Sequence, residues 1–323
     1  MARLPAIFFL VVFSVAAFAA EVKPPAVVGK AYMIGDLASG QILAAHRIDE
    51  RFEPASLTKL MTAYVVFGAL RDKKITLDQQ VSVSTKAWKA PGSRMFIEPR
   101  RPVNVDELIR GVVVQSGNDA CIALAEAVAG DEAVFVQMMN REAARLGMKN
   151  TKFMNASGLP DAQHYSTAHD LYLLTAALIR DFPNEYAQYY SQKEYRYNGI
   201  TQPNRNRLLW SDPSVDGVKT GHTEAAGYCL VASAQRGGRR LLSVLLGSTS
   251  EATRAQESLK LLNWGYQFFD SVRLYNAGNP VRSLDVWKGA LNHVKVGVGA
   301  DLFVTVAQGE FVTIPPPPDV ADW

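Results

Sequence analysis

The sequence predicts an α/β protein in which segments from both ends of one large domain form a single antiparallel sheet, with a block of helices between them. Residues 26–45 alternate apolar and small side chains around a turn at 38–40, which is typical of a β-hairpin. Three apolar, β-favouring segments separated by glycine-containing turns follow later, at residues 215–220, 227–234 and 240–248. Gly237-Gly238 is a strong hairpin signal between the last two. Strands on both sides of a helical block imply that the terminal segments share one sheet.

Apolar residues at helical spacing fill the middle of the chain. A long, mostly buried helix is predicted to begin near Pro54, where Leu57, Leu60 and Met61 open the pattern. Further helices, each opening near an acidic or hydroxyl residue that can cap it, are predicted at residues 105–129, 132–146 and 167–179. Helical spacing returns at residues 252–269, after the last strand-like segment.

Composition excludes several classes of protein. A chain of 323 residues with 48% hydrophobic and 20% charged residues is long enough for one large domain and a small appendage, and it is not disordered or fibrous. The formal net charge of +3 is too slight for a nucleic-acid binder, so no nucleic-acid partner is expected. The basic pairs Arg100-Arg101 and Arg239-Arg240 are interpreted as solvated turns.

The first residues have the order of a secretory signal peptide. Arg3 precedes an apolar stretch at 7–15, and Ala17-Phe18-Ala19 supplies the small-residue cleavage pattern, so we predict a signal peptide at 1–19 with cleavage after Ala19 or Ala20. The alternative is a membrane-spanning helix, but the apolar stretch is shorter than the ~20 residues that a span needs. We therefore expect an exported, periplasmic protein, with association at the outer face of the inner membrane left open.

Cysteine and histidine usage argues against a metal site. Cys121 and Cys229 each lie in an apolar segment and are interpreted as buried thiols, with a disulfide between them left open. The five histidines are scattered and no HExxH pair occurs. No metal and no cofactor are predicted.

Beyond residue 270 the composition changes. Short strand-like pieces at 294–297, 302–306 and 311–314, separated by Gly and Asn, predict a partial β-rich C-terminal domain at 271–314. Four prolines at 315–318 open a tail at 315–323 that we expect to be extended or disordered.

Three short motifs carry chemistry: S-x-x-K at 56–59, S-x-N at 116–118 and K-T-G at 219–221. Ser56 and Lys59 share one helix face, so the lysine amine can accept the proton of the serine hydroxyl. A lysine serves as a base only where burial and nearby cations lower its pKa, and Lys219 is the expected second cation. The positive end of the helix favours negative charge on Ser56 Oγ.

The other two motifs complete a cleft. Ser116 and Asn118 lie in a turn before a new helical run, and we expect Ser116 to relay a proton to a leaving amine while the Asn118 amide orients Lys59 and binds the substrate backbone. Lys219-Thr220-Gly221 lies on a predicted edge strand, where unpaired backbone groups can bind an extended peptide. Gly221 is expected to let that peptide come close.

Each motif alone occurs by chance in many chains, whereas all three in this order and context form a strong signal. Five stretches around them closely resemble the low-molecular-mass penicillin-binding proteins of the D-alanyl-D-alanine carboxypeptidase type, namely residues 54–70, 111–130, 202–210, 215–233 and 257–269. The resemblance covers residues 26–270, taken as the catalytic domain. It implies the penicillin-recognising fold of serine β-lactamases and transpeptidases: a five-stranded antiparallel sheet flanked by helices, with a helical subdomain and the nucleophile between the two parts.

The resemblance also implies residue roles. Ser56 matches the acyl-enzyme nucleophile, Lys59 the general base, and Ser116 with Asn118 the proton-relay and orienting pair. Lys219 matches the electrostatic residue, and Thr220 the hydroxyl that meets the substrate carboxylate. His222 resembles the residue whose backbone N–H joins that of Ser56 in an oxyanion hole. Arg254 falls where the family has a carboxylate-binding arginine, although a surface cation at a helix start is the alternative interpretation.

The implied function is removal of the terminal D-alanine from peptidoglycan stem pentapeptides in cell-wall biogenesis, with β-lactams as covalent inhibitors. A DD-endopeptidase of the same fold remains an alternative. A β-lactamase is disfavoured because Gly117 replaces the aspartate of the class A motif and no E-x-x-L-N segment precedes Lys219. A non-catalytic wall-binding module is disfavoured because it has no need of a serine–lysine pair.

The chain departs from the family near its C-terminus. Such carboxypeptidases often continue through a complete β domain to an amphipathic helix that lies on the membrane, whereas this chain resembles them only to about residue 306. We therefore expect an incomplete β domain, which a natural truncation or a changed reading frame would explain. The sequence of residues 312–323 has no pattern of a helix with an apolar face and basic flank, so membrane attachment is left open.

Overall fold

The computed structural model describes residues 22–310 of the chain. The signal peptide predicted at 1–19, the strand predicted at 311–314 and the tail at 315–323 lie outside the described residues.

A five-stranded antiparallel sheet forms the centre of the molecule, with the strand order β2-β1-β9-β8-β7. Its strands are β1 (Ala31–Asp36), β2 (Ile42–His46), β7 (Val215–Thr223), β8 (Gly227–Arg236) and β9 (Arg239–Ser248). The β1–β2 hairpin therefore joins strands β7, β8 and β9 through the β1–β9 pair, as the sequence predicts. Gly237-Gly238 forms the predicted turn between β8 and β9.

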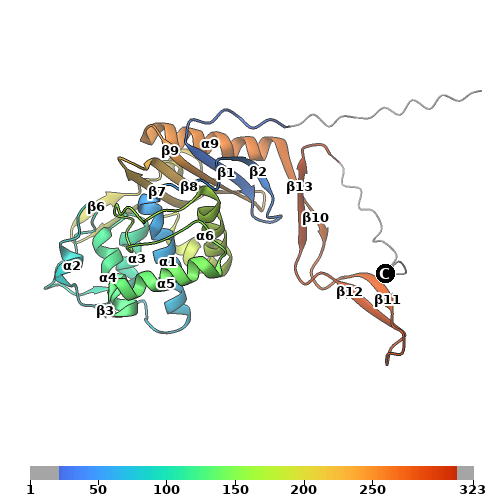
Figure 1. Ribbon diagram of the computed structural model, residues 1–323, viewed down its shortest axis with the longest axis horizontal. Coiled ribbons are helices and arrows are strands. Elements are labelled where there is room, and N and C mark those ends of the chain that lie inside the picture. Colours follow the sequence, from blue (N-terminus) through green and yellow to red (C-terminus); the bar gives the residue numbers. More distant parts are fainter. Residues whose placement is uncertain (1–21, 311–323) are drawn as a thin grey trace, which may run out of the picture.

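Helices cover both faces of this sheet (Figure 1). On one face α9 packs against β9, β8 and β1, and on the other α6 packs against β9 and β1 as part of a larger helical block. Six consecutive residues of β8 and of β9 are buried, because a sheet covered on both faces has no solvent side. This explains why the two strands are continuous apolar runs and do not alternate.

Residues 22–310 contain nine α-helices, and several of them begin at a side-chain cap of the kind that the sequence predicts. Thr167 accepts from the Asp170 N–H to start α6, and Asn104 with Glu107 forms a capping box at α3. A 3-10 turn, η1 (Ala55–Thr58), precedes α1. The helices are α1 (Lys59–Arg71), α2 (Thr85–Trp88), α3 (Val105–Val113), α4 (Asn118–Ala129), α5 (Glu132–Arg145), α6 (Ala168–Asp181), α7 (Pro183–Tyr189), α8 (Leu208–Ser211) and α9 (Glu251–Phe268).

Two predictions about helices need correction. The segment 105–129 is two helices, α3 and α4, because Ser116 adopts a left-handed backbone with φ of 59° that no α-helix can contain. The helix predicted from Pro54 starts with the 3-10 turn, and α1 itself begins at Lys59. Within residues 22–310 no helix combines the length and the apolar character that a membrane span requires.

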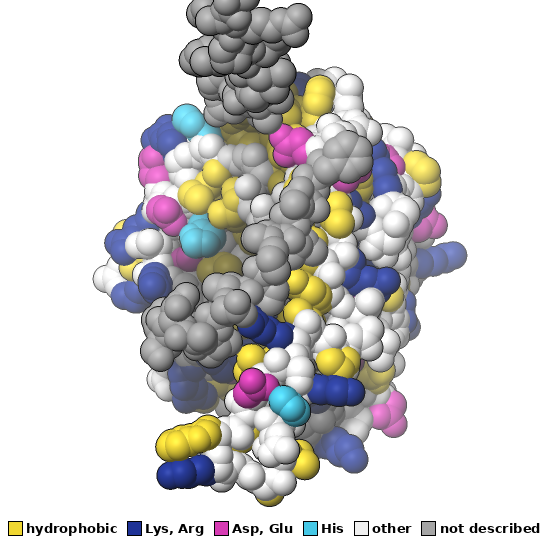
Figure 2. Space-filling model, turned by 90° about the vertical axis from the view of Figure 1, so that its right-hand side faces the viewer, with side chains coloured by type: hydrophobic (Ala, Val, Ile, Leu, Met, Phe, Trp, Pro, Cys, Tyr) yellow, Lys and Arg dark blue, Asp and Glu magenta, His cyan; other side chains and the backbone are white. Residues whose placement is uncertain are grey.

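Small strand pairs complete the fold. Two lie in the helical half, β3 (Gln80–Val81) with β4 (Val103–Asn104), and β5 (Glu194–Tyr197) with β6 (Ile200–Pro203). Two follow α9, namely β10 (Phe269–Tyr275) with β13 (Leu302–Ala307), and β11 (Pro280–Asp285) with β12 (His293–Gly297). Strands β12 and β13 occupy two predicted positions, whereas β10 and β11 were not predicted. On the C-terminal face drawn in Figure 2, basic side chains are interspersed with acidic and apolar ones.

The expectation that Arg239 lies in a solvated turn is wrong. Its Nε donates to the fully buried Asp36 carboxylate over 2.6 Å, and Asp36 also accepts from the Ser271 hydroxyl of β10. Burial alone would raise the pKa of Asp36, but the hydrogen bonds from Ser271 and Arg239 hold it below its usual value. Arg240 likewise pairs with Asp216 at 2.6 Å. The Asp36 cluster therefore joins β1, β9 and the first C-terminal strand.

Replacing Asp36 tests how much this cluster contributes to the stability of the fold. In Asp36→Asn the guanidinium of Arg239, whose side chain is only 12% exposed, loses its counter-charge, so we expect the free energy of unfolding in urea at pH 7 to fall by about 3 kcal/mol. The matched control is Glu50→Gln, which breaks the exposed Arg47–Glu50 pair and should cost no more than about 0.5 kcal/mol. Equal losses in the two variants would contradict this assignment.

Candidate active site

The three sequence motifs meet where the helical block contacts strand β7. Ser56 lies on η1, Ser116 and Asn118 lie at the α3–α4 turn, and Lys219 lies on β7, which is the edge strand of the sheet. A cavity of about 360 Å³ opens there, lined by Ser56, Ser93, Ser116, Arg205, Thr220, Gly221, His222, Tyr228, Glu251 and Arg254. Residues that are 165 positions apart thus share one cleft, from Ser56 to Gly221.

The Lys59 amine is buried and held by three oxygen atoms. Its Nζ lies 3.0 Å from Ser56 Oγ, 2.7 Å from Asn118 Oδ1 and 2.5 Å from the Ser157 carbonyl oxygen. Burial lowers the pKa of Lys59 to about 8, although the Asp119 carboxylate opposes this shift. A useful fraction of the side chain is therefore an uncharged amine near neutral pH, within hydrogen-bond reach of a hydroxyl.

Lys219 occupies the other side of the cleft. Its Nζ donates to Ser116 Oγ and to the Thr220 carbonyl oxygen, both at 3.0 Å. Burial, followed by the charge of Lys59, holds the pKa of Lys219 well below its ordinary value. The structure thus places the Lys219 amine beside Ser116, at the site where the sequence predicts a second lysine.

Backbone strain marks two positions beside the nucleophile. Ala55 has φ of 48° and Ser116 has φ of 59°, and non-glycine residues rarely adopt this left-handed region. Such conformations cost roughly 1–3 kcal/mol each and persist only where surrounding contacts fix them. Here they direct Ser56 and Ser116 into the same cavity.

Two motif residues have further contacts beside the nucleophile. The Asn118 amide oxygen accepts from Lys59 Nζ at 2.7 Å, and its amide nitrogen donates one of its two N–H groups to the Pro91 carbonyl oxygen at 2.7 Å. A side chain on Gly221 would meet the Pro54 carbonyl oxygen at 3.0 Å. The space that Gly221 leaves therefore lets β7 approach the turn that carries Ser56, and Gly221 also lines the cavity.

Arg254 is not a surface cation. Only 3% of the residue is exposed, and its Nη2 donates to Glu251 at 3.2 Å and to the Arg205 carbonyl oxygen at 3.4 Å. His222 is exposed to the cavity and its ring packs against that of Tyr228, with centroids 4.1 Å apart and the ring planes tilted by 31°. The predicted substrate-binding residues Thr220, His222 and Arg254 thus line one wall.

Sequence reasoning missed Ser93, Arg205, Tyr228 and Glu251 as lining residues. For Arg205 a signal existed in the flanking asparagines, which are turn formers. The Asn204 side chain accepts from the Asn206 N–H at 2.9 Å, and the Asn206 amide donates to the Gly217 carbonyl oxygen at 2.9 Å. These bonds fix the loop that holds Arg205 at the cavity.

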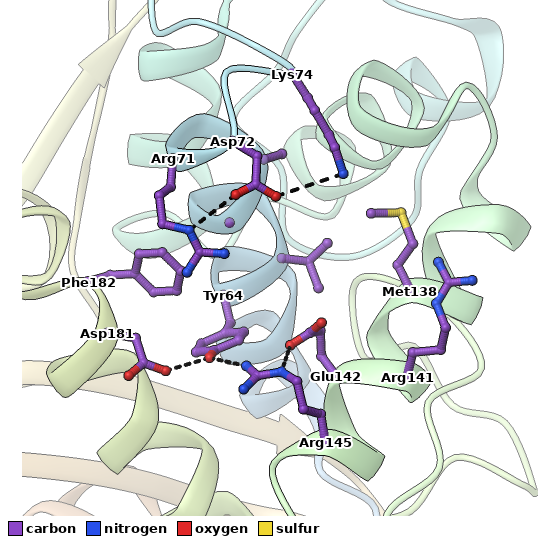
Figure 3. A pocket seen from close by; sticks show the side chains of 13 residues that line it. Tyr64, Arg71, Asp72, Lys74, Met138, Arg141, Glu142, Arg145, Asp181 and Phe182 are labelled. Carbon is purple, nitrogen blue, oxygen red and sulfur yellow. Dashed lines mark hydrogen bonds and ion pairs between the residues drawn. The ribbon is translucent and has the colours of Figure 1, made fainter.

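A larger cavity of about 640 Å³ lies at the other end of α1 (Figure 3). Arg145 donates there to the Tyr64 hydroxyl and to Glu142, and Tyr64 donates to Asp181. Its described lining has no serine, cysteine or histidine, and most of its charges are neutralised locally. The smaller cavity is the one lined by residues of all three sequence motifs.

Both cysteines are buried free thiols. Burial raises the pKa of Cys121 to about 12, so it remains a neutral thiol and not a nucleophile.

A lysine placed to activate a serine is characteristic of the acyl-transfer enzymes in which lysine replaces the histidine of the serine–histidine–aspartate triad. Residues 18–250 match the peptidase family described as D-alanyl-D-alanine carboxypeptidase, and residues 269–314 match the C-terminal domain of penicillin-binding protein 5. The chain belongs to the D-alanyl-D-alanine carboxypeptidase family, as its motifs indicated. The second match extends beyond residue 306, where the resemblance seen in the sequence ended.

Individual relatives agree. The chain is 47% identical to the D-alanyl-D-alanine carboxypeptidase DacC of Escherichia coli, over 94% of this chain and 78% of that protein. It is 43% identical to DacA of the same organism, over 88% and 72%. Penicillin-binding protein 5 of Haemophilus influenzae superposes with a TM-score of 0.87 at 44% identity, over 89% of this chain and 85% of that one. The predicted fold class, with its five-stranded sheet and small C-terminal β domain, is confirmed.

The titration of Lys59 tests the electrostatics of the site. We expect a midpoint near pH 8 by NMR of isotopically labelled lysine side chains, with the signal assigned by its absence in Lys59→Met. Asn118→Asp places a carboxylate 2.7 Å from Nζ and should raise the midpoint by at least about one pH unit. A wild-type midpoint above about 10, the usual lysine value, would show that the amine is not desolvated.

Proposed function

We propose that this enzyme removes the terminal D-alanine from peptidoglycan stem pentapeptides through an acyl-enzyme on Ser56. The observation that carries the proposal is the 3.0 Å approach of the buried Lys59 amine, with its pKa of about 8, to Ser56 Oγ. A hydroxyl is a weak nucleophile until a neighbouring base accepts its proton, and the uncharged fraction of Lys59 supplies that base.

The reaction proceeds in two halves. Ser56 Oγ forms a bond to the carbonyl carbon between the two D-alanines while its proton passes to Lys59. The carbon–nitrogen bond then breaks, and the departing amine takes a proton from the Ser116 hydroxyl, which lies 3.0 Å from the Lys219 amine and is reprotonated by the proton that Lys59 accepted. Water then attacks the ester carbonyl carbon while the Lys59 amine takes one of its protons. The ester bond breaks as Lys59 passes this proton to Ser56 Oγ, so the shortened stem peptide leaves and Ser56 and Lys59 return to their starting states. Because the base must be uncharged, acylation should become faster as the pH rises through the pKa of Lys59.

Cations and a sheet edge support binding of the substrate. The substrate carboxylate fits the wall with the Thr220 hydroxyl and the Arg254 guanidinium, and Arg205 adds a third group to that wall. Backbone N–H groups of Ser56 and His222 would bind the oxyanion, since both residues line the cavity. The unpaired edge of β7 suits an extended peptide, which can add to the sheet as a further strand.

β-Lactams should acylate Ser56 as substrate mimics. Penicillin-binding protein D2 of Listeria monocytogenes is known in ampicillin-bound and cefotaxime-bound forms and superposes on this chain with a TM-score of 0.70 at 31% identity. The same chemistry in this cleft would give a covalent penicillin adduct.

The cellular setting belongs to the same proposal. The signal-peptide pattern in residues 1–19 supports export to the periplasm, where the peptidoglycan substrate is found. We further propose that residues 26–270 form the catalytic domain and residues 271–314 the partial β-rich domain.

Release of free D-alanine from an acylated L-Lys-D-Ala-D-Ala peptide tests the activity and its nucleophile together. The chain from Ala20 onward should release D-alanine, and Ser56→Ala should abolish release because no acyl-enzyme can form. Loss should be at least about 10³-fold, as in other enzymes deprived of their nucleophile. A folded wild-type chain that forms a penicillin adduct but releases no D-alanine would point to the endopeptidase alternative.

A further inference from the structure

A turn at residues 155–159 contacts both the nucleophile's turn and the helix that carries its base. The Ser157 carbonyl oxygen accepts from Lys59 Nζ at 2.5 Å, and the Ala156 carbonyl oxygen accepts from the Thr62 hydroxyl at 2.5 Å. Gly158 has φ of +84°, and a Cβ atom there would lie 1.8 Å from the Ala55 carbonyl oxygen. The turn is therefore packed directly against the residue that precedes Ser56.

One side chain, Asn155, builds this turn. Its Oδ1 accepts from the backbone N–H groups of Ser157, Gly158 and Leu159, at 3.2, 2.8 and 3.1 Å. Its Nδ2 donates to the Leu159 carbonyl oxygen at 3.0 Å. An asparagine that bridges three successive N–H groups fixes a turn which local backbone bonds alone would leave open.

His164 ties the turn to η1. Its Nε2 lies 2.9 Å from the Thr58 hydroxyl, and its Nδ1 faces Asn155 Nδ2 at 3.4 Å. Because an amide nitrogen only donates, Nδ1 must accept, and the ring proton is on Nε2 and points to Thr58. Burial lowers the pKa of His164 to about 4, so the ring is neutral in the working range.

The position of the Ser157 carbonyl oxygen affects which way the lone pair of the Lys59 amine points, and so from which group Lys59 can accept a proton. An uncharged amine has two N–H donors and one lone pair. With Asn118 Oδ1 and the Ser157 carbonyl oxygen as the two acceptors, the lone pair is left facing Ser56 Oγ. Without the second acceptor the amine can rotate away from the hydroxyl.

We propose that Asn155 is a positioning residue for the general base: it shapes the 155–159 turn so that the Ser157 carbonyl aims the Lys59 amine at Ser56. This role rests on the proposed function, because it presumes that Lys59 activates Ser56. Asn155 itself does not contact the substrate cavity.

The chain offers a matched control in Asn140. Like Asn155 it is half-buried and bridges backbone groups nearby, since its Nδ2 donates to the Phe153 carbonyl oxygen at 2.8 Å and its Oδ1 accepts from the Phe153 N–H at 2.9 Å. It thus anchors the same stretch of chain two residues earlier, without contacting the 155–159 turn. Asn140→Ala should lower stability as Asn155→Ala does.

The test is the second-order rate of acylation by a fluorescent penicillin, measured between pH 6 and 10 alongside the thermal midpoint of unfolding. Asn155→Ala should acylate at least about tenfold more slowly than wild type, since small misplacements of a catalytic group have effects of this order or larger. Asn140→Ala should stay within about threefold. Asn155→Asp keeps the acceptor for the three N–H groups and should recover most of the rate at high pH. Its added negative charge should raise the pKa of Lys59 and move the rate profile to higher pH.

Distinct results separate the two proposals. Equal rates for folded Asn155→Ala and wild type, or an equal slowing in Asn140→Ala, would overturn the positioning role while leaving the function intact. Failure of Asn155→Asp to recover the rate or to shift its pH profile would overturn it as well. A wild-type chain that penicillin does not label would overturn the proposed function and this role together.

Discussion

The active site is organised by the cost of burying two lysine amines. An ammonium group loses strong hydration when it enters a protein, and oxygen acceptors must replace the lost water. Lys59 obtains them from three separate segments of chain, and Lys219 from two. The 3-10 turn, the α3–α4 break and the edge strand converge because each supplies atoms to these amines. The same burial that costs stability lowers the pKa of both lysines, so one constraint produces both the architecture and the basicity of the site.

Much of the fold could be predicted because many of its elements have clear local sequence patterns. The strands β8 and β9 are unbroken apolar runs joined by Gly237-Gly238, and α6 starts at its predicted cap, Thr167. The strands β10 and β11 escaped prediction because charged and polar residues interrupt their apolar pattern. Exposure is not the reason, because β12 was predicted although every one of its residues is exposed.

The site could be predicted as a set of residues but not as a set of contacts. The spacing predicted that Ser56 lies beside Lys59, because residues three positions apart on a helix lie on the same face. It could not show that Gly221 faces the nucleophile's turn, that Arg239 is buried against a carboxylate, or that Asn155 shapes the base's surroundings. Each of these depends on which distant atoms a residue meets after folding.

The central sheet has two edges, and they serve different purposes. Strand β7 at one edge faces the cavity, while the β1–β2 hairpin at the other contacts the C-terminal strands through Asp36, Ser39 and Gln41 (Figure 1). Strands β9 and β8 lie between the two. Insertions, losses or replacements in the C-terminal strands can therefore change how the enzyme is held relative to its surroundings while the reacting atoms stay where they are. The fold is in this sense modular, with its adaptable part attached at the edge that chemistry does not use.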